Sequence, residues 1–312
     1  MFEILINLIL ASLFFNAQVN EQATLNNFTQ VDYRLPQAEM RYLEEEAPQA
    51  VENPESAGVK VTAKSALVVD AESGKILFEK NPQEVRSIAS ITKLMTALVF
   101  LEHNPGWDKE ITMAQSDFRE GATSRLMVGE VVSVKDVFYT ALVASANEAS
   151  VALARSTGLS EEEFIKKMND QALELGMKDT KFVDLTGLED GNKSTAVDVA
   201  ILVKTAFTQK EIFRAASTSN HKITILNKNI TRKIASTDWI LNQTFGVGGS
   251  SYRVEAGKTG YLEIAGYSFA SQITDQSGKK LITVVLGSDT IDDRFVDTKS
   301  LAYWVYHNFK WQ

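Results

Sequence analysis

Two pairs of short strand-like runs lie near opposite ends of this chain, with helical patterns between them. Each run is rich in aliphatic residues, and each pair is separated by a short polar segment that contains glycine, which is typical of a hairpin. We expect the terminal strands to form one antiparallel sheet flanked by helices, with a mostly helical subdomain inserted between them. The predicted fold class is therefore α+β. The runs are Ser65–Asp70, Lys75–Glu79, Tyr267–Ile273 and Lys280–Leu286.

The residues between these strands carry the periodicity of amphipathic helices. From about Ser90, apolar residues recur at i, i+3, i+4 and i+7, so they share one helical face that predicts a contact with a core. These apolar residues are Ile91, Leu94, Met95 and Leu98. Further helical patterns cover residues 134–156, 160–176 and 195–207, and another follows the last strand at 293–309.

The chain opens with an apolar run from Ile4 to Phe15. The run is too short to cross a bilayer as a helix, which needs about 20 apolar residues, but it suits the hydrophobic part of a secretory signal. No Lys or Arg precedes it, and residues 15–17 form a poor cleavage site. We expect residues 1–17 to be a signal peptide or an N-terminal membrane anchor; a buried N-terminal helix is the alternative. The expected location is extracytoplasmic: secreted, periplasmic or anchored to the outer face of the cell membrane.

Residues 18–58 differ from the rest of the chain in composition. They contain three of the five prolines, eight acidic residues and two basic residues. Their net charge of −6 leaves −2 of the total of −8 for all other residues. Such a segment buries too little apolar surface to offset the entropy of ordering it, so we expect an acidic, disordered linker before a domain of residues 59–312. No basic face stands out, which argues against nucleic acid as a partner.

The sequence Ser90-Ile-Thr-Lys93 lies where the first strand pair gives way to a helix. Residues at i and i+3 share a helical face, with Cβ atoms about 5–6 Å apart, so Lys93 can direct its amine at the Ser90 hydroxyl. A helix start also presents unpaired backbone N–H groups to developing negative charge. Two other S-x-x-K matches, at Ser219 and Ser277, lie in polar turn-like sequence and are interpreted as solvent-exposed.

Two further motifs follow in chain order, Ser145-Ala-Asn147 and Lys258-Thr-Gly260. Each pattern, S-x-N and K-[ST]-G, occurs once in the chain, and the second leads into a strand-like segment. S-x-x-K, S-x-N and K-T-G together are the motif set of the class A β-lactamases and penicillin-binding proteins. All three in this order favour one acyl-transfer site, with Ser90 as the nucleophile, over three unrelated surface matches.

With these motifs the chain resembles the low-molecular-mass penicillin-binding proteins, the serine D-alanyl-D-alanine carboxypeptidases of peptidase family S11. The resemblance extends over residues 63–309 and implies a β-lactamase/transpeptidase-like α/β sandwich. The chain departs from the family pattern at Ser87, at Leu262 and within Ser145–Glu148, which bears on substrate preference more than on activity. The match extends around the motifs and beyond them, to Ile88–Ala97, Glu174–Met177, Thr186–Leu188, Ser194–Asp198, Gly257–Tyr261, Ala265–Tyr267, Arg294 and Asp297.

The resemblance implies the catalytic roles. Ser90 attacks the carbonyl of the penultimate D-alanine and forms an acyl-enzyme, Lys93 acts as general base, and Ser145 passes the proton to the leaving amine. A base needs a neutral amine, and both burial and the nearby charge of Lys258 are expected to lower the pKa of Lys93.

The resemblance also implies the substrate-binding residues. Asn147 holds the substrate backbone or the general base, while Lys258 and Thr259 bind the terminal carboxylate. Gly260 lets the strand approach the substrate closely. The backbone N–H of Tyr261, together with that of the nucleophile, forms the oxyanion hole.

The implied substrates are peptidoglycan stem peptides that end in D-Ala-D-Ala, and β-lactams are implied as covalent inhibitors of Ser90. A D,D-endopeptidase that cleaves peptidoglycan cross-links is the nearest alternative, because many carboxypeptidase relatives continue beyond the last helix and this chain stops soon after Phe309. A β-lactamase is less favoured, since the chain has no Glu-x-x-Leu-Asn motif; Asp238–Asn242 is similar but lies too close in sequence to Lys258. A catalytically idle penicillin-binding scaffold has no support in the sequence.

The sequence predicts neither a metal site nor a cofactor. The chain has no cysteine, and its three histidines, His103, His221 and His307, form no H-E-x-x-H pattern. We expect each of them to be a surface or core residue.

Overall fold

The computed structural model describes residues 49–50, 56, 58–119, 124–247 and 249–311. The chain divides into two units, Met1–Glu44 and Glu45–Gln312, and every described residue belongs to the second. The predicted signal or anchor of residues 1–17 and most of the predicted linker lie outside the described residues. In the described part of the chain, no helix is both long enough and apolar enough to span a membrane.

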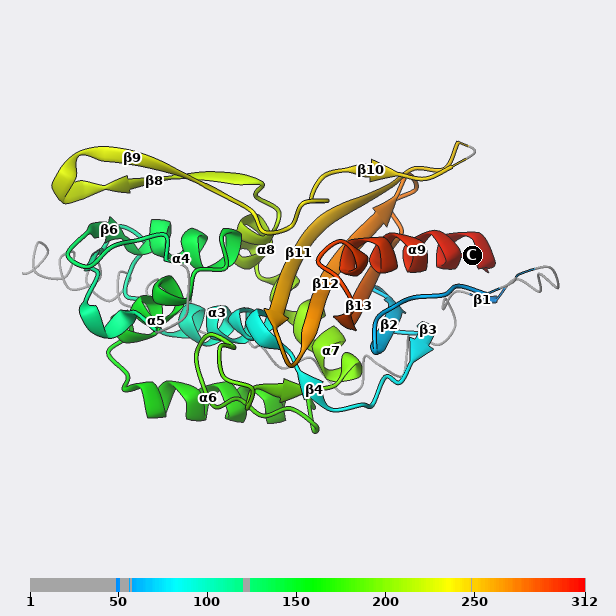
Figure 1. Ribbon diagram of the computed structural model, residues 1–312, viewed down its shortest axis with the longest axis horizontal. Helices are drawn as coiled ribbons and strands as arrows, with labels where there is room; N and C mark the ends of the chain where they lie inside the picture. The colour runs from blue at the N-terminus through cyan, green and yellow to red at the C-terminus, as the bar shows by residue number, and fades with distance from the viewer. Residues whose placement is uncertain (1–48, 51–55, 57, 120–123, 248, 312) are drawn as a thin grey trace, which may run out of the picture. The chain divides into compact units, whose positions relative to one another are not determined.

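A six-stranded antiparallel sheet brings the two ends of the second unit together (Figure 1). The N-terminal strand β2 pairs with the C-terminal strand β13, from Asp70 opposite Leu281 to Ser65 opposite Leu286. This pairing confirms the α+β prediction and the sheet of terminal strands. In sheet order the strands are β10 (Thr244–Phe245), β11 (Tyr252–Leu262), β12 (Gly266–Asp275), β13 (Lys280–Ser288), β2 (Ser65–Asp70) and β3 (Ile76–Lys80).

Each face of the sheet is covered by a helix. Successive side chains of a strand point to opposite faces, and β2 is buried on both. Leu67 and Val69 join the core on the side of α7 (Ala196–Thr208), while Val68 joins the core on the side of α9 (Asp293–Asn308). The sheet is therefore the middle layer of a sandwich.

A group of helices forms the subdomain beside the sheet. Its centre is α3, whose residues from Lys93 to Phe100 are all buried. The sequence predicts a single apolar stripe on this helix, but α3 packs against α4, α5, α6 and α7 and is enclosed all round. The helices are α3 (Lys93–Glu102), α4 (Val134–Val143), α5 (Asn147–Ser156), α6 (Glu161–Glu174) and α8 (Lys210–Ala216).

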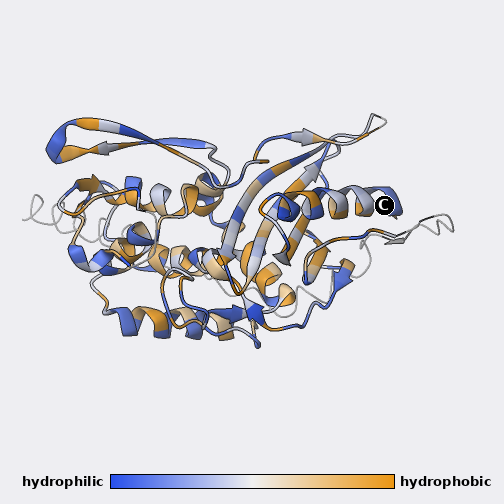
Figure 2. Ribbon diagram, viewed as in Figure 1, coloured by the Kyte–Doolittle hydropathy of each residue, from blue (hydrophilic) through white to orange (hydrophobic). Residues whose placement is uncertain are grey.

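Side-chain caps explain where several helices begin. Ser160 Oγ accepts a hydrogen bond from the Glu163 backbone N–H, and the Glu163 carboxylate accepts one from the Ser160 N–H, a reciprocal pair that starts α6. Ser133 and Thr195 cap α4 and α7 with one bond each, accepted by the side chain from the backbone N–H of Asp136 and of Asp198. Figure 2 shows α6 alternating between hydrophilic and hydrophobic stretches, as expected of a helix with one buried face.

The helical pattern over residues 134–156 corresponds to two helices rather than one. The chain leaves helical geometry between α4 and α5, where Ser145 adopts the left-handed conformation with φ of 55°. This break contains neither Gly nor Pro, so periodicity alone conceals it. The predicted helices at 160–176, 195–207 and 293–309 correspond to α6, α7 and α9.

Of the strands that the structure describes, the remaining ones form four small ladders. The longest, β8 with β9, is a hairpin that the sequence analysis does not predict. Gln49–Ala50, inside the predicted linker, pairs with the last strand; the disorder of the other linker residues stays a prediction. The ladders join β1 (Gln49–Ala50) to β14 (Phe309–Lys310), β4 (Arg86–Ser87) to β7 (Lys193–Ser194), β5 (Glu110–Thr112) to β6 (Val131–Ser133), and β8 (Asn220–Ile225) to β9 (Ile230–Ala235).

Candidate active site

Ser90 lies on a tight 3-10 turn, η1 (Ala89–Thr92), that leads directly into α3. The preceding residue, Ala89, has a φ of 46°, which is rare for a residue with a side chain. A second loop crosses this turn at Gly187, where an added Cβ would lie 1.8 Å from the Ala89 carbonyl oxygen. Only glycine fits there, and the close crossing fixes the strained backbone that presents Ser90.

Lys93 follows one turn later and points its amine at Ser90. Its Nζ lies 2.8 Å from Ser90 Oγ, 2.6 Å from Asn147 Oδ1 and 2.7 Å from the Thr186 carbonyl oxygen. The i, i+3 contact predicted from spacing is therefore present. Asn147 contacts Lys93, one of the two partners expected for it.

Burial lowers the pKa of Lys93 to about 7, from an ordinary value near 10.5. The side chain is only 1% exposed, and desolvation disfavours a charged amine. The negative charges of Asp184 and Glu148 act in the opposite direction but do not outweigh the burial. Both the charged and the neutral form of Lys93 are therefore populated near neutral pH.

A second serine–lysine contact lies beside the first. Nζ of Lys258 donates to Ser145 Oγ at 2.7 Å and to the Thr259 carbonyl at 3.0 Å. The left-handed conformation of Ser145 turns its hydroxyl away from the helical path and toward this amine. Burial lowers the pKa of Lys258 well below its ordinary value, and the charge of Lys93 lowers it further. The charge of Lys93 therefore acts on Lys258, whereas burial, rather than the expected charge of Lys258, lowers the pKa of Lys93.

The third motif lies within β11 rather than before a strand. Thr259 Oγ1 is 2.7 Å from the hydroxyl of Thr237, and Tyr261 is exposed at the end of the motif. A Cβ on Gly260 would lie 2.8 Å from the Ile88 carbonyl oxygen, so glycine here lets β11 approach the residues that precede Ser90. Sequence reasoning assigned this glycine to close approach by a substrate; the structure shows that the backbone around Ser90 also requires it.

Sequence reasoning assigned no role to the loop that supplies the Thr186 carbonyl. Asp184 organises it: one carboxylate oxygen accepts hydrogen bonds from the backbone N–H groups of Thr186 and Gly187, and the other accepts one from Glu189 at 2.8 Å. This loop belongs to the Thr186–Leu188 segment that matches the family. Which of its atoms touches the lysine could not be read from residue types, because the contact is a backbone carbonyl.

Two buried charged residues adjoin the strand that carries the third motif. Arg294, 5% exposed, lies with its guanidinium carbon 5.7 Å from the ring centre of Tyr267 and its Nη1 3.5 Å from the Gly260 carbonyl. Asp238 is also 5% exposed, which agrees with its interpretation as packed rather than as a β-lactamase glutamate. Sequence reasoning noted Arg294 as a match without a role and did not place Asp238 near the site.

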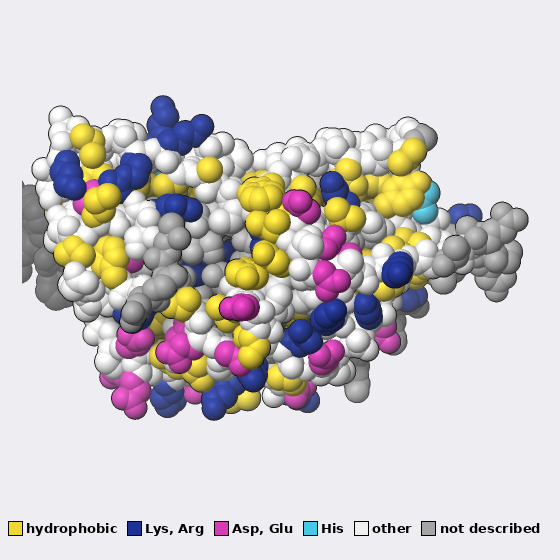
Figure 3. All heavy atoms as spheres, in the orientation of Figure 1, with side chains coloured by type: hydrophobic (Ala, Val, Ile, Leu, Met, Phe, Trp, Pro, Cys, Tyr) yellow, Lys and Arg dark blue, Asp and Glu magenta, His cyan; other side chains and the backbone are white. Residues whose placement is uncertain are grey.

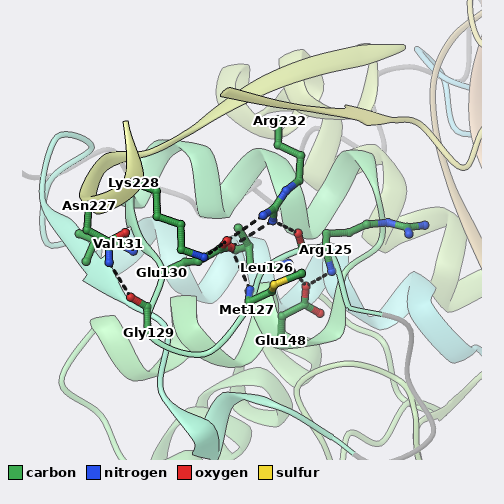
Figure 4. A network of polar contacts seen from close by, with 10 residues as sticks. All are labelled: Arg125, Leu126, Met127, Gly129, Glu130, Val131, Glu148, Asn227, Lys228 and Arg232. Carbon is green, nitrogen blue, oxygen red and sulfur yellow. Dashed lines mark hydrogen bonds and ion pairs between the residues drawn. The ribbon is translucent and has the colours of Figure 1, made fainter. Parts of the chain in front are cut away.

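A loop next to the site is held by two buried glutamates. Figure 4 shows Glu148, the residue after Asn147, pointing at the backbone N–H groups of Arg125 and Leu126, which lie 2.6 and 3.0 Å from its carboxylate. Figure 4 also shows Glu130 held by Arg232 and Lys228 of the β8–β9 hairpin, at 2.7 and 3.0 Å. These contacts tie the hairpin, the loop and α5 into one assembly.

The surface beside the site is partly apolar. Trp239, Tyr261 and Ile264 are exposed large hydrophobic residues of this region, with Ile264 71% exposed. Figure 3 shows hydrophobic side chains gathered near the middle of the face on which β11 lies.

The remaining sequence candidates lie outside the site. Ser277 donates a hydrogen bond to Asp275 in a turn, and Ser219 lies at the base of the β8–β9 hairpin. Neither of these two S-x-x-K serines is part of the site around Lys93. His221 contacts the Asp136 carboxylate at 2.8 Å. Among the residues that the structure describes, no cluster of three or more His, Cys, Asp or Glu side chains could hold a metal ion.

An α/β sandwich with a buried lysine at a serine hydroxyl, a second serine–lysine pair and a lysine-threonine-glycine strand defines the class of penicillin-recognising serine enzymes. The chain matches the family Peptidase_S11, described as D-alanyl-D-alanine carboxypeptidase, over residues 48–290. The chain belongs to this family. The predicted resemblance and enzyme class are thereby confirmed.

Curated relatives carry two activity names. A D-alanyl-D-alanine endopeptidase of Pseudomonas aeruginosa is 33% identical over 244 residues, covering 77% of this chain and 76% of the relative. A D-alanyl-D-alanine carboxypeptidase, DacF of Bacillus subtilis, is 33% identical over 256 residues, covering 80% of this chain and 63% of the relative. The chain thus spans less than two thirds of that carboxypeptidase.

A solved structure has the same fold. Penicillin-binding protein D2 from Listeria monocytogenes, in its cefotaxime-bound form, is 30% identical with a TM-score of 0.68, covering 80% of this chain and all of that one. The Streptomyces K15 DD-transpeptidase, at 24% identity and a TM-score of 0.72, shares the fold. The predicted β-lactamase/transpeptidase-like fold is confirmed.

Proposed function

We propose that this protein is a serine D-Ala-D-Ala carboxypeptidase that trims peptidoglycan stem peptides through an acyl-enzyme on Ser90. The observation that carries the proposal is the set of three partners around the Lys93 amine. Two of them, an amide oxygen and a backbone carbonyl, can only accept hydrogen bonds. A neutral amine donates both its N–H groups to these two acceptors, which leaves its lone pair directed at the Ser90 hydroxyl.

Acylation follows from this arrangement. Lys93 takes the proton of Ser90, the serine oxygen bonds to the carbonyl carbon of the penultimate D-alanine, and the bond to the last D-alanine breaks. The proton passes through the Ser145 hydroxyl to the leaving nitrogen. Lys258, 2.7 Å from that hydroxyl, holds it in place. Water then attacks the acyl carbon and gives a proton to neutral Lys93. The bond between that carbon and the Ser90 oxygen breaks, Lys93 returns the proton to the serine oxygen, and the shortened peptide leaves.

The charge that develops on the reacting carbonyl needs donors. We assign this role to the backbone N–H groups of Ser90 and Tyr261, since Gly260 brings β11 against the turn that carries the serine. One such donor contributes about 2.7–4 kcal/mol to lowering a barrier of this kind. The terminal carboxylate of the substrate would bind near Thr259, where Arg294 supplies a positive charge and Lys258 supplies a second one when its amine is protonated.

β-Lactams carry a similar carboxylate and a reactive amide, so they should acylate Ser90. Intact-mass measurement of residues 59–312 with and without a penicillin tests this directly. A stable adduct that is lost in Ser90→Ala, with D-alanine released from a D-Ala-D-Ala peptide, supports the proposal. Rapid turnover of penicillin without a lasting adduct would favour a β-lactamase, and a folded protein without any adduct would favour an idle scaffold.

A D,D-endopeptidase is the second candidate, and the relatives named for that activity favour it. Besides the Pseudomonas protein, a D-alanyl-D-alanine endopeptidase of Escherichia coli is 30% identical and covers 83% of this chain. Both activities can use the same acylation machinery, because each breaks a bond that follows a D-alanine. Comparing the release of D-alanine from a pentapeptide with the cleavage of a cross-linked dimer, at equal enzyme concentration, separates the two.

Members of a peptidoglycan-processing family act outside the cytoplasm, and this chain is assigned there with its family. We propose that residues 1–17 direct the export and are then either cleaved off by a signal peptidase or retained as a membrane anchor. Mass spectrometry of the N-terminus after cell fractionation distinguishes these fates. A protein that retains residue 1 yet stays in the soluble cytoplasm contradicts both.

A further inference from the structure

Asp238 is a buried carboxyl group with one oxygen left unpaired. Oδ1 accepts a hydrogen bond from the Ile240 backbone N–H at 3.0 Å. Oδ2 is buried and has no hydrogen-bond partner among the described residues. An ionised carboxylate in this position loses hydration that the backbone N–H groups of Ile240 and Leu241 do not replace. The protonated form therefore competes with the charged form here, unlike at an exposed aspartate.

The position of Asp238 links it to the end of the site where a carboxylate would bind. Its neighbour Thr237 lies 2.7 Å, hydroxyl to hydroxyl, from Thr259. Gly257 is two residues before Thr259, and alternate residues of a strand share a face. A Cβ on Gly257 would lie 2.8 Å from Asp238 Oδ2, so the absent side chain provides the space that the carboxyl group occupies.

The groups that face Asp238 come from three elements and from its own segment. β11 contributes Lys258, α9 contributes Arg294, and β12 contributes the uncharged ring of Phe269 beside Gly257. Its own segment contributes backbone N–H groups only. Burial raises the pKa of Asp238 to about 7, and the N–H groups and the two cations oppose that rise without cancelling it.

We propose that Asp238 is a specificity-determining residue whose own protonation controls how tightly the site holds the free carboxylate of a substrate. The inference rests on the proposed function, because it assigns the carboxylate to the region of Thr259, Lys258 and Arg294. When Asp238 is protonated, Arg294 and the protonated form of Lys258 are both available to the substrate. When it is ionised, its negative charge offsets theirs and repels the bound anion.

The effect has a definite sign. As pH rises through neutrality, Asp238 becomes charged and the KM for a carboxylate-bearing substrate rises. Lys93 acts in the opposite direction on the chemical step, because its neutral fraction grows over the same range. The profile of kcat/KM is therefore bell-shaped, with an acid limb from Lys93 and an alkaline limb from Asp238.

The test is the variant Asp238→Asn, which can keep the hydrogen bond from Ile240 and cannot ionise. KM and kcat are measured between pH 5.5 and 8.5 for a D-Ala-D-Ala peptide and for the same peptide with a C-terminal carboxamide. In the native protein, KM for the free carboxylate should rise about fivefold or more across this range, as is usual for coupling between two sites. In the variant, and with the carboxamide in either protein, KM should stay flat.

The variant Asp108→Asn is the matched control, since Asp108 is exposed and its loss removes the same charge; it should retain the native profile. If Asp238→Asn does not fold, Asp238→Ser, whose hydroxyl can also accept from Ile240, provides the same readout. The proposal is overturned if the alkaline limb persists in the variant and moves to lower pH. Such a limb would belong to Lys258, whose pKa falls when the negative charge of Asp238 is removed. Failure of the proposed function would appear differently, as no release of D-alanine from the peptide by either protein at any pH, with or without a penicillin adduct.

Discussion

The side-chain oxygen of Asn147 lies 2.6 Å from Nζ of Lys93, nearer than the other two partners of that amine. An amide oxygen accepts a hydrogen bond from either the charged or the neutral amine. It therefore fixes the position of Lys93 without bringing a full negative charge next to it. An aspartate at position 147 would place a full negative charge next to Lys93.

Asn147→Asp should move the acid limb of the acylation rate to higher pH. A carboxylate in contact with an amine favours the charged amine, and such contacts shift pKa values by about 1–3 units. The rate of penicillin acylation at saturation, measured from pH 5 to 9, reports the shift. Asn220→Asp, on the exposed start of β8, adds the same charge elsewhere and should leave the limb in place. An unchanged limb in Asn147→Asp would mean that Lys93 is not the titrating base.

The native acylation rate should itself fall below neutral pH. The pKa of Lys93 is about 7, and the proposed base is the neutral amine. Each pH unit below the pKa reduces the neutral fraction about tenfold, so at pH 6 we expect about a tenth of the plateau rate. Lys93→Arg, which stays charged, should lose about 10²–10⁴-fold. A saturated rate that is flat from pH 5 to 8 would contradict this role.

Gly187→Ala should impair acylation, while Gly176→Ala should not. The two glycines have φ of 78° and 80°, so alanine meets the same backbone strain at both, about 1–2 kcal/mol. They differ in their surroundings: a Cβ at Gly176 meets nothing within 4 Å, whereas at Gly187 it would lie 1.8 Å from the Ala89 carbonyl oxygen. Ala89 precedes the nucleophile, so the clash displaces Ser90. Thermal unfolding of the two variants reports the backbone strain, and their penicillin acylation rates report the displacement of Ser90. Equal acylation rates in the two variants would show that the close crossing at Gly187 does not position Ser90.

Features that depend on spacing along the chain were predictable from sequence. The i, i+3 relation between Ser90 and Lys93 follows from helical geometry, and the 3-10 start of the helix does not disturb it. The hairpins of β2 with β3 and of β12 with β13 follow from the turn residues between strand-like runs. In these cases the physical determinant is local, and residue types express it directly.

Features that depend on tertiary contact were not predictable. Ser145 breaks a continuous helical pattern without Gly or Pro. The break lets one short segment contact two lysines, Lys258 through Ser145 and Lys93 through Asn147. The third partner of Lys93 is the Thr186 carbonyl, and any residue type supplies a carbonyl. Asp238 reaches the site only because β11 has a glycine opposite it. Such contacts are set by how distant segments pack.

The hairpin of β8 and β9 should depend on the ion pairs of Glu130 (Figure 4). The Glu130 side chain is fully buried and is held by Arg232 and Lys228, so removing Arg232 leaves a buried charge with one cation fewer. Arg232→Met should therefore cost about 1.5–3 kcal/mol in free energy of unfolding, the range for a hydrogen bond to a charged group. Hydrogen exchange should quicken in residues 220–235, whereas the penicillin acylation rate should change little.

Two companion variants test the cause of that loss. Lys233→Met removes an exposed cation from the same hairpin and should leave stability within about 0.5 kcal/mol of native. Glu130→Met combined with Arg232→Met removes the buried charge as well, and apolar replacement of a buried pair is often neutral. The double variant should therefore recover part of the stability lost in Arg232→Met. The double variant could instead have a lower free energy of unfolding than Arg232→Met alone. That result would mean that Glu130 stabilises the loop mainly by accepting the hydrogen bond from the Met127 N–H.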